Sequence, residues 1–290
     1  MMAEPAGPMS GKVCLVTGAT SGIGEVTAGV LARKGATVVV VGRNPQKCEA
    51  TVGRIRERTG NPAVEPLVAD LSSQVEVRRL ADEFGRRHDR LDVLVNNAGA
   101  LLMDRRESVD GIEMTFALNH LAYFLLTDLL LDRLRGSAPS RIVVVSSDAH
   151  RGVTMDFDDL GGRAKYRGSR AYGRSKLANV LFVRELARRL EGTGVTANAL
   201  HPGFVASGFF SGDGPAWWAM RRLAGLFAVT PERGAETSVY LASSPEVEGV
   251  TGRYFVKEKP VEPSPAARDV EAARRLWRVS EEMTGRVASR

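Results

Sequence analysis

Short apolar runs recur along the chain and alternate with longer stretches in which apolar residues follow a helical period. The first run, Lys12 to Val16, is followed by an amphipathic stretch from about Glu25 to Lys34. A short apolar run bounded by turn residues predicts a buried strand, and the longer period predicts a helix. We expect strands near residues 12–17, 37–42, 64–69, 91–96, 141–146, 194–200 and 253–256, with helices between them and a last helix near 266–284.

This alternation predicts an α/β fold class: a single-domain, Rossmann-type, doubly wound parallel sheet of about seven strands with helices on both faces. We expect a disordered lead at residues 1–10 and one catalytic domain over 11–290. In such a sheet, ligands bind at the carboxyl ends of the strands. The residues that end or follow strands at that edge are Gly18, Asn96, Ser147 and Pro202. The sequence therefore predicts that these residues share one cleft.

The composition narrows the class of protein. The chain has 290 residues and a net charge of +6, carried mostly by arginines scattered along the predicted helices. Because aromatic and basic residues do not interleave, we interpret this charge as solvated helix faces and expect no nucleic-acid partner. The two cysteines, Cys14 in the first strand and Cys48 on a polar helix, predict neither a disulfide nor a metal site.

Targeting signals are also missing from the pattern. No apolar run reaches the length needed to span a bilayer, and residues 1–9 lack the basic start and apolar core of a signal peptide. We therefore expect no transmembrane segment and a cytoplasmic location.

A glycine-rich segment, Thr17 to Gly24, joins the first strand to the first helix with the spacing Gly-x3-Gly-x-Gly. Gly18 would permit a tight turn, while Gly22 and Gly24 would let the backbone approach a pyrophosphate at the helix N-terminus. Glycines also occur in tight turns for steric reasons alone. The loop residues that we expect to contact a dinucleotide are Gly18, Thr20, Ser21, Gly22, Ile23 and Gly24.

Tyr172 and Lys176 stand four residues apart, so in a helix they lie on one face, one turn apart. A phenol titrates near ~10 in water, and a neighbouring cation favours the phenolate and lowers that pKa. The pair therefore predicts a general acid/base assembly. The alternative is an exposed helical pair with no chemical role.

Together, these motifs resemble the short-chain dehydrogenase/reductase family from about residue 11 to about 285. The other segments that carry the resemblance are Asn96-Asn97-Ala98-Gly99, Asn119, Ser146-Ser147 and Pro202-Gly203, in the family's order. Finer features resemble the retinol-dehydrogenase-like branch, namely residues 119–127, 175–182, 201–203 and 241–255 and the long insertion between Ser147 and Tyr172. The resemblance implies a nicotinamide-dependent oxidoreductase, with a homodimer or homotetramer as its assembly.

The end of the second strand bears on the cofactor. Many NAD-binding relatives carry an acid there, whereas this chain reads Arg43-Asn44. Arg43 can place a planar cation beside a 2′-phosphate, which favours NADP(H) over NAD(H), although Arg43 stacked on adenine would suit either. Glu25 opposes this choice, because relatives often carry a basic residue there. Asp70 and Leu71 resemble the family's adenine contacts, with a cap on the following helix as the alternative for Asp70.

The resemblance also implies the catalytic roles. Tyr172 would exchange a proton with the substrate oxygen, and Ser147 would hydrogen-bond the same oxygen, with Ser146 as the alternative serine. Lys176 would lower the pKa of Tyr172 and hold the nicotinamide ribose, and Asn119 would fix a water that relays protons to Lys176. The remaining expected cofactor contacts are Asn97, Ala98, Gly99, Pro202, Gly203, Val205 and Ser207; a capped strand end is the alternative role of Asn97.

Residues 204–228 lie where relatives keep a mobile lid over the substrate. We expect the substrate pocket to be lined by Ser147, Phe204, Phe209, Trp217 and Trp218. These aromatic residues predict a lipophilic aldehyde, ketone or alcohol, unless they pack on the core. A second class of function stays open: a redox-sensing or scaffold protein that binds NADP(H) with little catalysis. Retention of Tyr172, Lys176 and Ser147 favours the enzyme.

Overall fold

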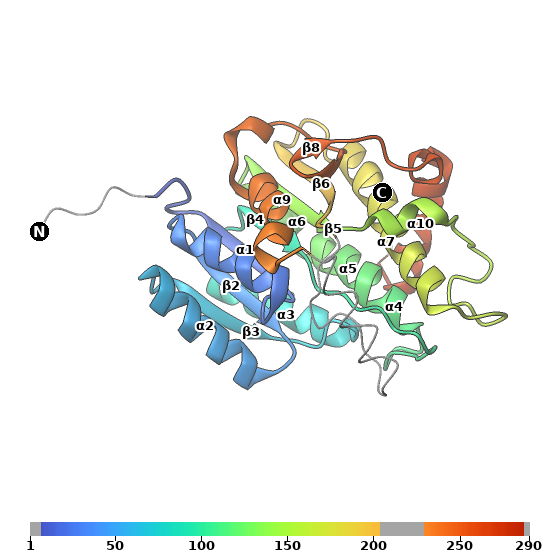
Figure 1. Cartoon of the computed structure of the whole chain (residues 1–290), viewed down its shortest axis with the longest axis horizontal. Helices are drawn as coiled ribbons and strands as arrows, with labels where there is room; N and C mark the ends of the chain where they lie inside the picture. Colours follow the sequence, from blue (N-terminus) through green and yellow to red (C-terminus); the bar gives the residue numbers. More distant parts are fainter. Residues whose placement is uncertain (1–6, 204–228, 287–290) are drawn as a thin grey trace, which may run out of the picture.

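The computed structural model describes residues 7–203 and 229–286, which build an eight-stranded sheet in the order β3-β2-β1-β4-β5-β6-β7-β8 (Figure 1). The strands are β1 (Val13–Thr17), β2 (Thr37–Gly42), β3 (Val64–Val68), β4 (Val93–Asn96), β5 (Ser140–Val145), β6 (Val195–His201), β7 (Tyr254–Val256) and β8 (Lys259–Pro260). Strands β1 to β7 run parallel. The predicted α/β fold class is confirmed.

Helices flank the sheet on both faces. They are α1 (Gly22–Arg33), α2 (Pro45–Thr59), α3 (Gln74–Arg87), α4 (Met114–Phe116), α5 (Ala122–Leu129), α6 (Leu131–Gly136), α7 (Gly168–Arg189), α9 (Pro231–Ser243) and α10 (Val270–Met283). Shorter helical turns are the π-helical η1 (Ala117–Leu121) and the 3₁₀ turns η2 (Asp148–Gly152), η3 (Pro245–Val247) and η4 (Pro265–Arg268). Helices α1 and α9 pack side by side on one face (Figure 1).

The core consists of two apolar layers because successive strand residues point to opposite faces of the sheet. Leu15 and Val39 join the layer under α3, α5, α7 and α10. Val16 and Val38 join the layer under α1, α2 and α9. With both faces covered, the strands read as continuous apolar runs, which is why they could be located from the sequence.

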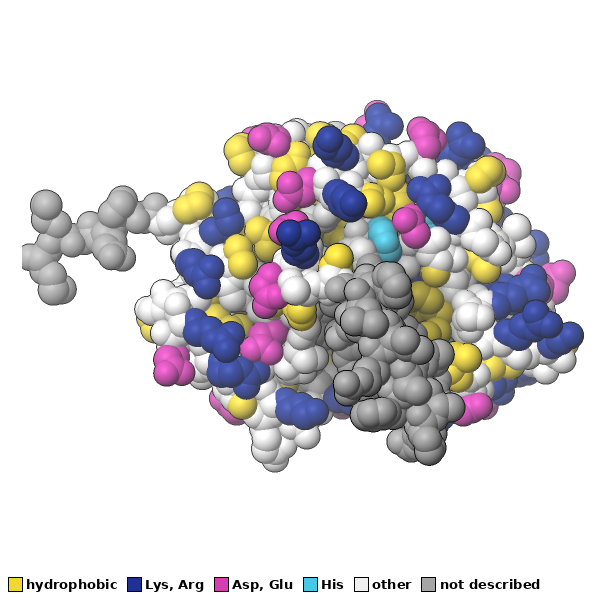
Figure 2. All heavy atoms as spheres, in the orientation of Figure 1, with side chains coloured by type: hydrophobic (Ala, Val, Ile, Leu, Met, Phe, Trp, Pro, Cys, Tyr) yellow, Lys and Arg dark blue, Asp and Glu magenta, His cyan; other side chains and the backbone are white. Residues whose placement is uncertain are grey.

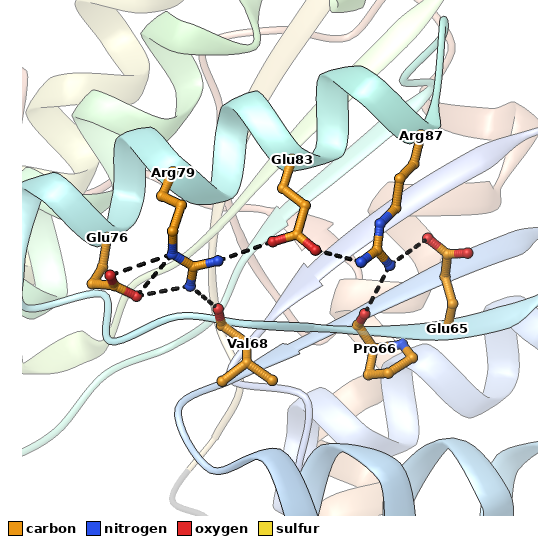
Figure 3. Close-up of polar contacts among 7 residues, drawn as sticks. All are labelled: Glu65, Pro66, Val68, Glu76, Arg79, Glu83 and Arg87. Atoms are coloured by element: carbon orange, nitrogen blue, oxygen red, sulfur yellow. Dashed lines mark hydrogen bonds and ion pairs between the residues drawn. The ribbon is translucent and has the colours of Figure 1, made fainter.

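The sheet edge at β3 is protected by side chains of α3 (Figure 3). Arg79 donates to the carbonyl of Val68, and Arg87 donates to the carbonyl of Pro66 at 3.4 Å. Glu83 pairs with both arginines, and its contact with Arg79 is 2.9 Å. An edge strand exposes unpaired carbonyls, so these arginines occupy positions at which another strand would otherwise pair.

Two elements differ from the sequence predictions. Strand β8 was not expected; it pairs antiparallel with β7 through a tight turn in which Lys257 and Glu258 have φ of 51° and 63°. A strand of two residues is too short to carry a sequence pattern. The last helix begins at Val270 rather than 266, because the Asp269 side chain caps it by accepting the N–H of Ala272.

The predicted disordered lead is wrong for residues 7–10. Met9 is buried, and its N–H donates to the carbonyl of Lys34 at 2.9 Å, which fixes this segment against the turn between α1 and β2. The predicted lid at 204–228 lies outside the described residues.

Charged side chains of both signs are interspersed over the face shown in Figure 2. No helix in the described ranges is long and apolar enough to cross a membrane. Over the same part of the chain, no cluster of three or more His, Cys, Asp or Glu side chains could hold a metal ion. The cytoplasmic location stays a prediction.

Candidate active site

The β1–α1 loop is built around two glycines that approach other backbone closely. Gly18 has a φ of +64°, and a Cβ added to it would lie 2.7 Å from the Cα of Ala98. A Cβ on Gly24 would lie 2.3 Å from the carbonyl oxygen of Gly18. Ser21 precedes α1 in an extended conformation and its side chain does not cap the helix, so the first N–H groups of α1 have no side-chain cap from this residue. This arrangement is suited to an anionic group, as expected of a pyrophosphate site.

The end of β4 holds this loop in place. The Nδ2 of Asn97 donates to the carbonyls of Thr17 and Gly18 at 2.9 and 3.2 Å. The hydroxyl of Thr17 accepts the N–H groups of Asn97 and Ala98 at 2.8 and 3.1 Å. The Asn97 side chain therefore fixes the glycine loop, which is the structural role that the sequence left open. Any contact of Asn97 or Ala98 with a cofactor stays a prediction.

Arg43 and Asn44 are exposed at the end of β2, beside the same edge of the sheet. The Asn44 side chain caps α2 by accepting the N–H of Lys47 at 2.9 Å. Glu25, in the first turn of α1, pairs with Arg54 of α2 at 3.0 Å. The guanidinium of Arg54 therefore neutralises the carboxylate of Glu25, the residue that opposed the prediction of NADP(H).

Asp70 stabilises the turn before α3 instead of capping that helix. Its Oδ1 accepts both the N–H and the hydroxyl of Ser72, at 2.9 and 2.7 Å. The helix cap is Ser73, whose hydroxyl accepts the N–H of Glu76. The helix-cap alternative for Asp70 is therefore wrong, because the helix starts one turn later. Leu71 is buried in the core.

Tyr172 and Lys176 lie one turn apart on α7, as predicted, and Ser147 follows β5. The side chains of Tyr172 and Ser147 are hydrogen-bonded. The Lys176 ammonium lies 5.6 Å from the centre of the Tyr172 ring and donates to the carbonyl of Val145 at 3.0 Å. The fold thus brings three of the four predicted catalytic side chains together at the carboxyl end of β5.

The two neighbouring serines have different partners. The hydroxyl of Ser146 is buried and donates to the backbone carbonyl of Lys176 at 2.7 Å. The hydroxyl of Ser147 accepts the N–H of Ala149 at 3.2 Å and hydrogen-bonds Tyr172. Of the pair, Ser147 is the one that contacts the phenol, while Ser146 ties β5 to α7.

Asn119 lies in the π-helical turn η1, a distortion that often occurs at functional sites. Its Nδ2 donates to the carbonyl of Ala100 at 2.9 Å and to the hydroxyl of Ser175 at 3.0 Å. A Cβ added to Gly99 would lie 3.1 Å from the Oδ1 of Asn119 and 3.6 Å from the Nζ of Lys176. Gly99 therefore separates two of the predicted catalytic side chains. The expected water relay through Asn119 stays a prediction.

The pKa shifts differ from the expectation that Lys176 lowers the pKa of Tyr172. Burial raises the pKa of Tyr172 to about 12, and its hydrogen bond with Ser147 only partly opposes this. Burial also lowers the pKa of Lys176 to about 7. Desolvation disfavours both charged forms and sets the direction of both shifts, and the ammonium donates to Val145 rather than to the phenol. The role of Lys176 in lowering the pKa of Tyr172 stays a prediction.

Pro202 and Gly203 follow β6 at the same edge, and Gly203 has a φ of +86°. The expected contacts Phe204, Val205, Ser207, Phe209, Trp217 and Trp218 lie outside the described residues.

The sequence reasoning missed a polar cluster around Ser147. The N–H of Asp148 donates to the Nδ1 of His201 at 3.3 Å, and the Tyr254 hydroxyl donates to Asp148 at 3.2 Å. His150 hydrogen-bonds the carbonyl of Ser147 at 2.7 Å. The sequence signal that could have indicated this cluster is the presence of Asp148 and His150 within three residues after Ser147.

Comparisons with known proteins agree with this geometry. A family model described as short chain dehydrogenase matches residues 12–214. Human retinol dehydrogenase 14 is 46% identical in an alignment that covers 96% of this chain and 88% of the relative. Human retinol dehydrogenase 13 is 44% identical over 95% of this chain and 85% of the relative.

Solved structures of other proteins also match this chain over most of its length. The crystal structure of an uncharacterized Mycobacterium paratuberculosis protein matches with a TM-score of 0.77 and 35% identity, over 95% of this chain and 94% of that one. The Pseudomonas aeruginosa RhlG/NADP active-site complex matches with a TM-score of 0.68 and 30% identity, over 87% of this chain and 96% of that one.

Proposed function

The chain belongs to the short chain dehydrogenase family, and we propose that it uses NADP(H) to interconvert a lipophilic aldehyde or ketone and the corresponding alcohol. The observation that carries the proposal is the hydrogen bond between Tyr172 and Ser147 beside Lys176 on the same helix. This is the residue set needed to exchange a proton with a substrate oxygen while a cofactor exchanges the hydride.

The residues of the β1–α1 loop fit a dinucleotide. Any side chain at Gly18 or Gly24 would overlap neighbouring backbone, and the N-terminus of α1 provides N–H groups for a pyrophosphate. Lys176, which borders Gly99 at the same edge, would hold the nicotinamide ribose. When bound, the nicotinamide supplies the hydride in reduction or accepts it in oxidation.

Two features favour NADP(H) over NAD(H). Arg43 is exposed at the end of β2, where an acid would select NAD(H) through the ribose hydroxyls. The carboxylate of Glu25 is paired with Arg54, which reduces its repulsion of a 2′-phosphate. The Pseudomonas aeruginosa relative was solved as a complex with NADP, which supports the same choice.

The side chains assign the proton steps. Because the pKa of Tyr172 is about 12, this phenol is protonated at neutral pH and is ready to donate to a developing alkoxide. Ser147, hydrogen-bonded to Tyr172, would orient the same oxygen. Donation leaves a phenolate, which the protonated form of Lys176 stabilises from one helical turn away. Since the pKa of Lys176 is about 7, that form predominates below neutral pH in the protein without cofactor.

The substrate class rests on the relatives and on the sequence. Two relatives that match nearly the whole chain are named retinol dehydrogenases, enzymes of a lipophilic alcohol. The aromatic residues predicted to line the pocket agree with such a substrate.

The test measures loss of reduced-nicotinamide absorbance with medium-chain aldehydes, retinal, steroid ketones and aromatic ketones, each with NADPH and with NADH. Tyr172→Phe should lower kcat by about a hundredfold or more while NADPH binding persists. Tyr166→Phe is the matched control, because Tyr166 is also partly buried and its pKa is also raised to about 12. The Tyr166→Phe variant should keep the wild-type kcat.

The outcomes separate the parts of the proposal. A preference for NADH would overturn the interpretation of Arg43. Equal turnover by wild type and Tyr172→Phe would overturn the catalytic assignment. Tight NADPH binding with no turnover of any substrate in the panel would favour the alternative, a redox-sensing or scaffold protein.

A further inference from the structure

His150 is buried between the proposed catalytic serine, Ser147, and residues 254–264, called here the C-terminal part of the chain. Its Nδ1 lies 2.7 Å from the carbonyl oxygen of Ser147, and its Nε2 lies 3.1 Å from the backbone nitrogen of Ser264. The ring packs edge-on against Tyr254, with 4.9 Å between the ring centres. The backbone N–H of His150 also donates to the Ser147 carbonyl, at 3.1 Å, so this residue holds the carbonyl with both its backbone and its ring.

The partners of the imidazole fix its tautomer. A backbone carbonyl can only accept, so the Nδ1 of His150 must carry a proton and donate to Ser147. A backbone N–H can only donate, so the Nε2 must be unprotonated and accept from Ser264. The ring therefore works as a neutral bridge, and burial supports this form by lowering the pKa of His150. Asp148 raises that pKa, whereas Arg151 and His201 lower it. Tyr254, which is also titratable, packs against the ring.

The same C-terminal part holds the catalytic loop, Ser147–Gly152, at two further points. Arg151 donates to the backbone carbonyl of Glu262 at 3.0 Å. The hydroxyl of Tyr254 donates to Asp148 at 3.2 Å. These contacts anchor the loop beside the serine. Among the described residues, the His150 ring is the one side chain that links the Ser147 carbonyl to the C-terminal part of the chain, at Ser264.

We propose that His150 is a positioning residue for Ser147, and that the backbone N–H of Ser264 holds the His150 ring in its orientation. By holding the Ser147 carbonyl, the bridge fixes the direction in which the serine hydroxyl meets Tyr172 and the substrate oxygen. This inference rests on the proposed function, since it takes Ser147 as part of the catalytic set. It also makes catalysis depend on Ser264, which lies 114 residues after His150 in the sequence.

Ser264→Pro tests the bridge by removing one N–H. Ser264 has a φ of −60°, which matches the φ of proline. The proline Cδ would replace the hydrogen of the N–H whose nitrogen lies 3.1 Å from the Nε2 of His150, so the substitution also displaces the imidazole. Ser264→Ala is the matched control: it also loses the hydroxyl that accepts the N–H of Ala267, but it keeps the backbone donor. His150→Phe provides a second disruption that retains a ring against Tyr254.

We expect kcat to fall about tenfold in Ser264→Pro and in His150→Phe, a loss of about 1.4 kcal/mol of transition-state stabilisation. The KM for NADPH should stay within about twofold, because the glycine loop is untouched. Ser264→Ala should keep the wild-type kcat. The double variant should be no slower than either single variant, because both remove the same bridge.

Equal kcat values for Ser264→Pro and Ser264→Ala would overturn the inference, as would fully additive losses in the double variant. Tyr172→Phe, assayed alongside, reports separately on the proposed function. If no substrate turns over, hydrogen exchange across residues 145–153 still decides the inference. Faster exchange in Ser264→Pro than in Ser264→Ala supports the bridge, and identical exchange refutes it.

Discussion

Acidification should destabilise this protein through His120, the histidine that follows the candidate catalytic Asn119. His120 is fully buried, and its two ring nitrogens lie 3.0 Å from the Ser280 hydroxyl and 3.4 Å from the Asn179 side chain. Burial lowers its pKa from 6.5 to about 4, although the hydrogen bond with Asn179 opposes the shift. The folded protein therefore holds this ring neutral at pH values where the unfolded chain protonates it.

Proton linkage gives the sign and size of the change in the free energy of unfolding with pH. Because the folded pKa lies below the unfolded value, the contribution of His120 is fully present above pH 6.5 and is lost as the pH falls toward 4. From the two pKa values, the free energy of unfolding should decrease by about 2 kcal/mol at pH 5 and about 3 kcal/mol at pH 4 relative to pH 8. The side chain is buried, so solvent screening does not reduce this amount.

Urea unfolding of wild type and His120→Gln between pH 4 and pH 8 measures the effect. The substitution removes the titrating group, and the carboxylates and other histidines contribute equally to both proteins. The wild type should therefore lose about 2 kcal/mol more than His120→Gln between pH 8 and pH 5. Parallel stability curves for the two proteins would show that His120 does not cause the loss of stability.

Two further predictions concern the cofactor side of the site. Gly24→Ala should weaken NADPH binding by about tenfold or more, or 1.4 kcal/mol, in a fluorescence titration, because the new Cβ would meet the Gly18 carbonyl at 2.3 Å. Gly29→Ala on the same helix is the control, because among the described residues nothing lies within 4 Å of its added Cβ. This control should bind NADPH with unchanged affinity, and weaker binding in both variants would contradict the prediction. Arg54→Met should reduce the NADPH-over-NADH preference by about two- to fivefold, the range of a partly exposed ion pair. Adding Glu25→Gln should restore the preference, and a double variant as impaired as Arg54→Met would show that charge is not the cause.

The local parts of the site could be predicted from the sequence. The glycine spacing, the four-residue separation of Tyr172 and Lys176, and the position of Ser147 after an apolar run are all properties of short segments. Because parallel strands present their carboxyl ends at one edge, the order of the strands then sufficed to bring these residues together. The strands themselves were readable because the sheet is buried on both faces.

Only the tertiary structure decided the electrostatics and the long-range contacts. The sequence placed a cation beside Tyr172, but the depth of burial set the direction of both pKa shifts. The pairing of Glu25 with Arg54 and the bridge from His150 to Ser264 join residues 29 and 114 positions apart. Desolvation and contacts across such separations depend on how helices and loops pack, and a one-dimensional pattern carries no record of that packing.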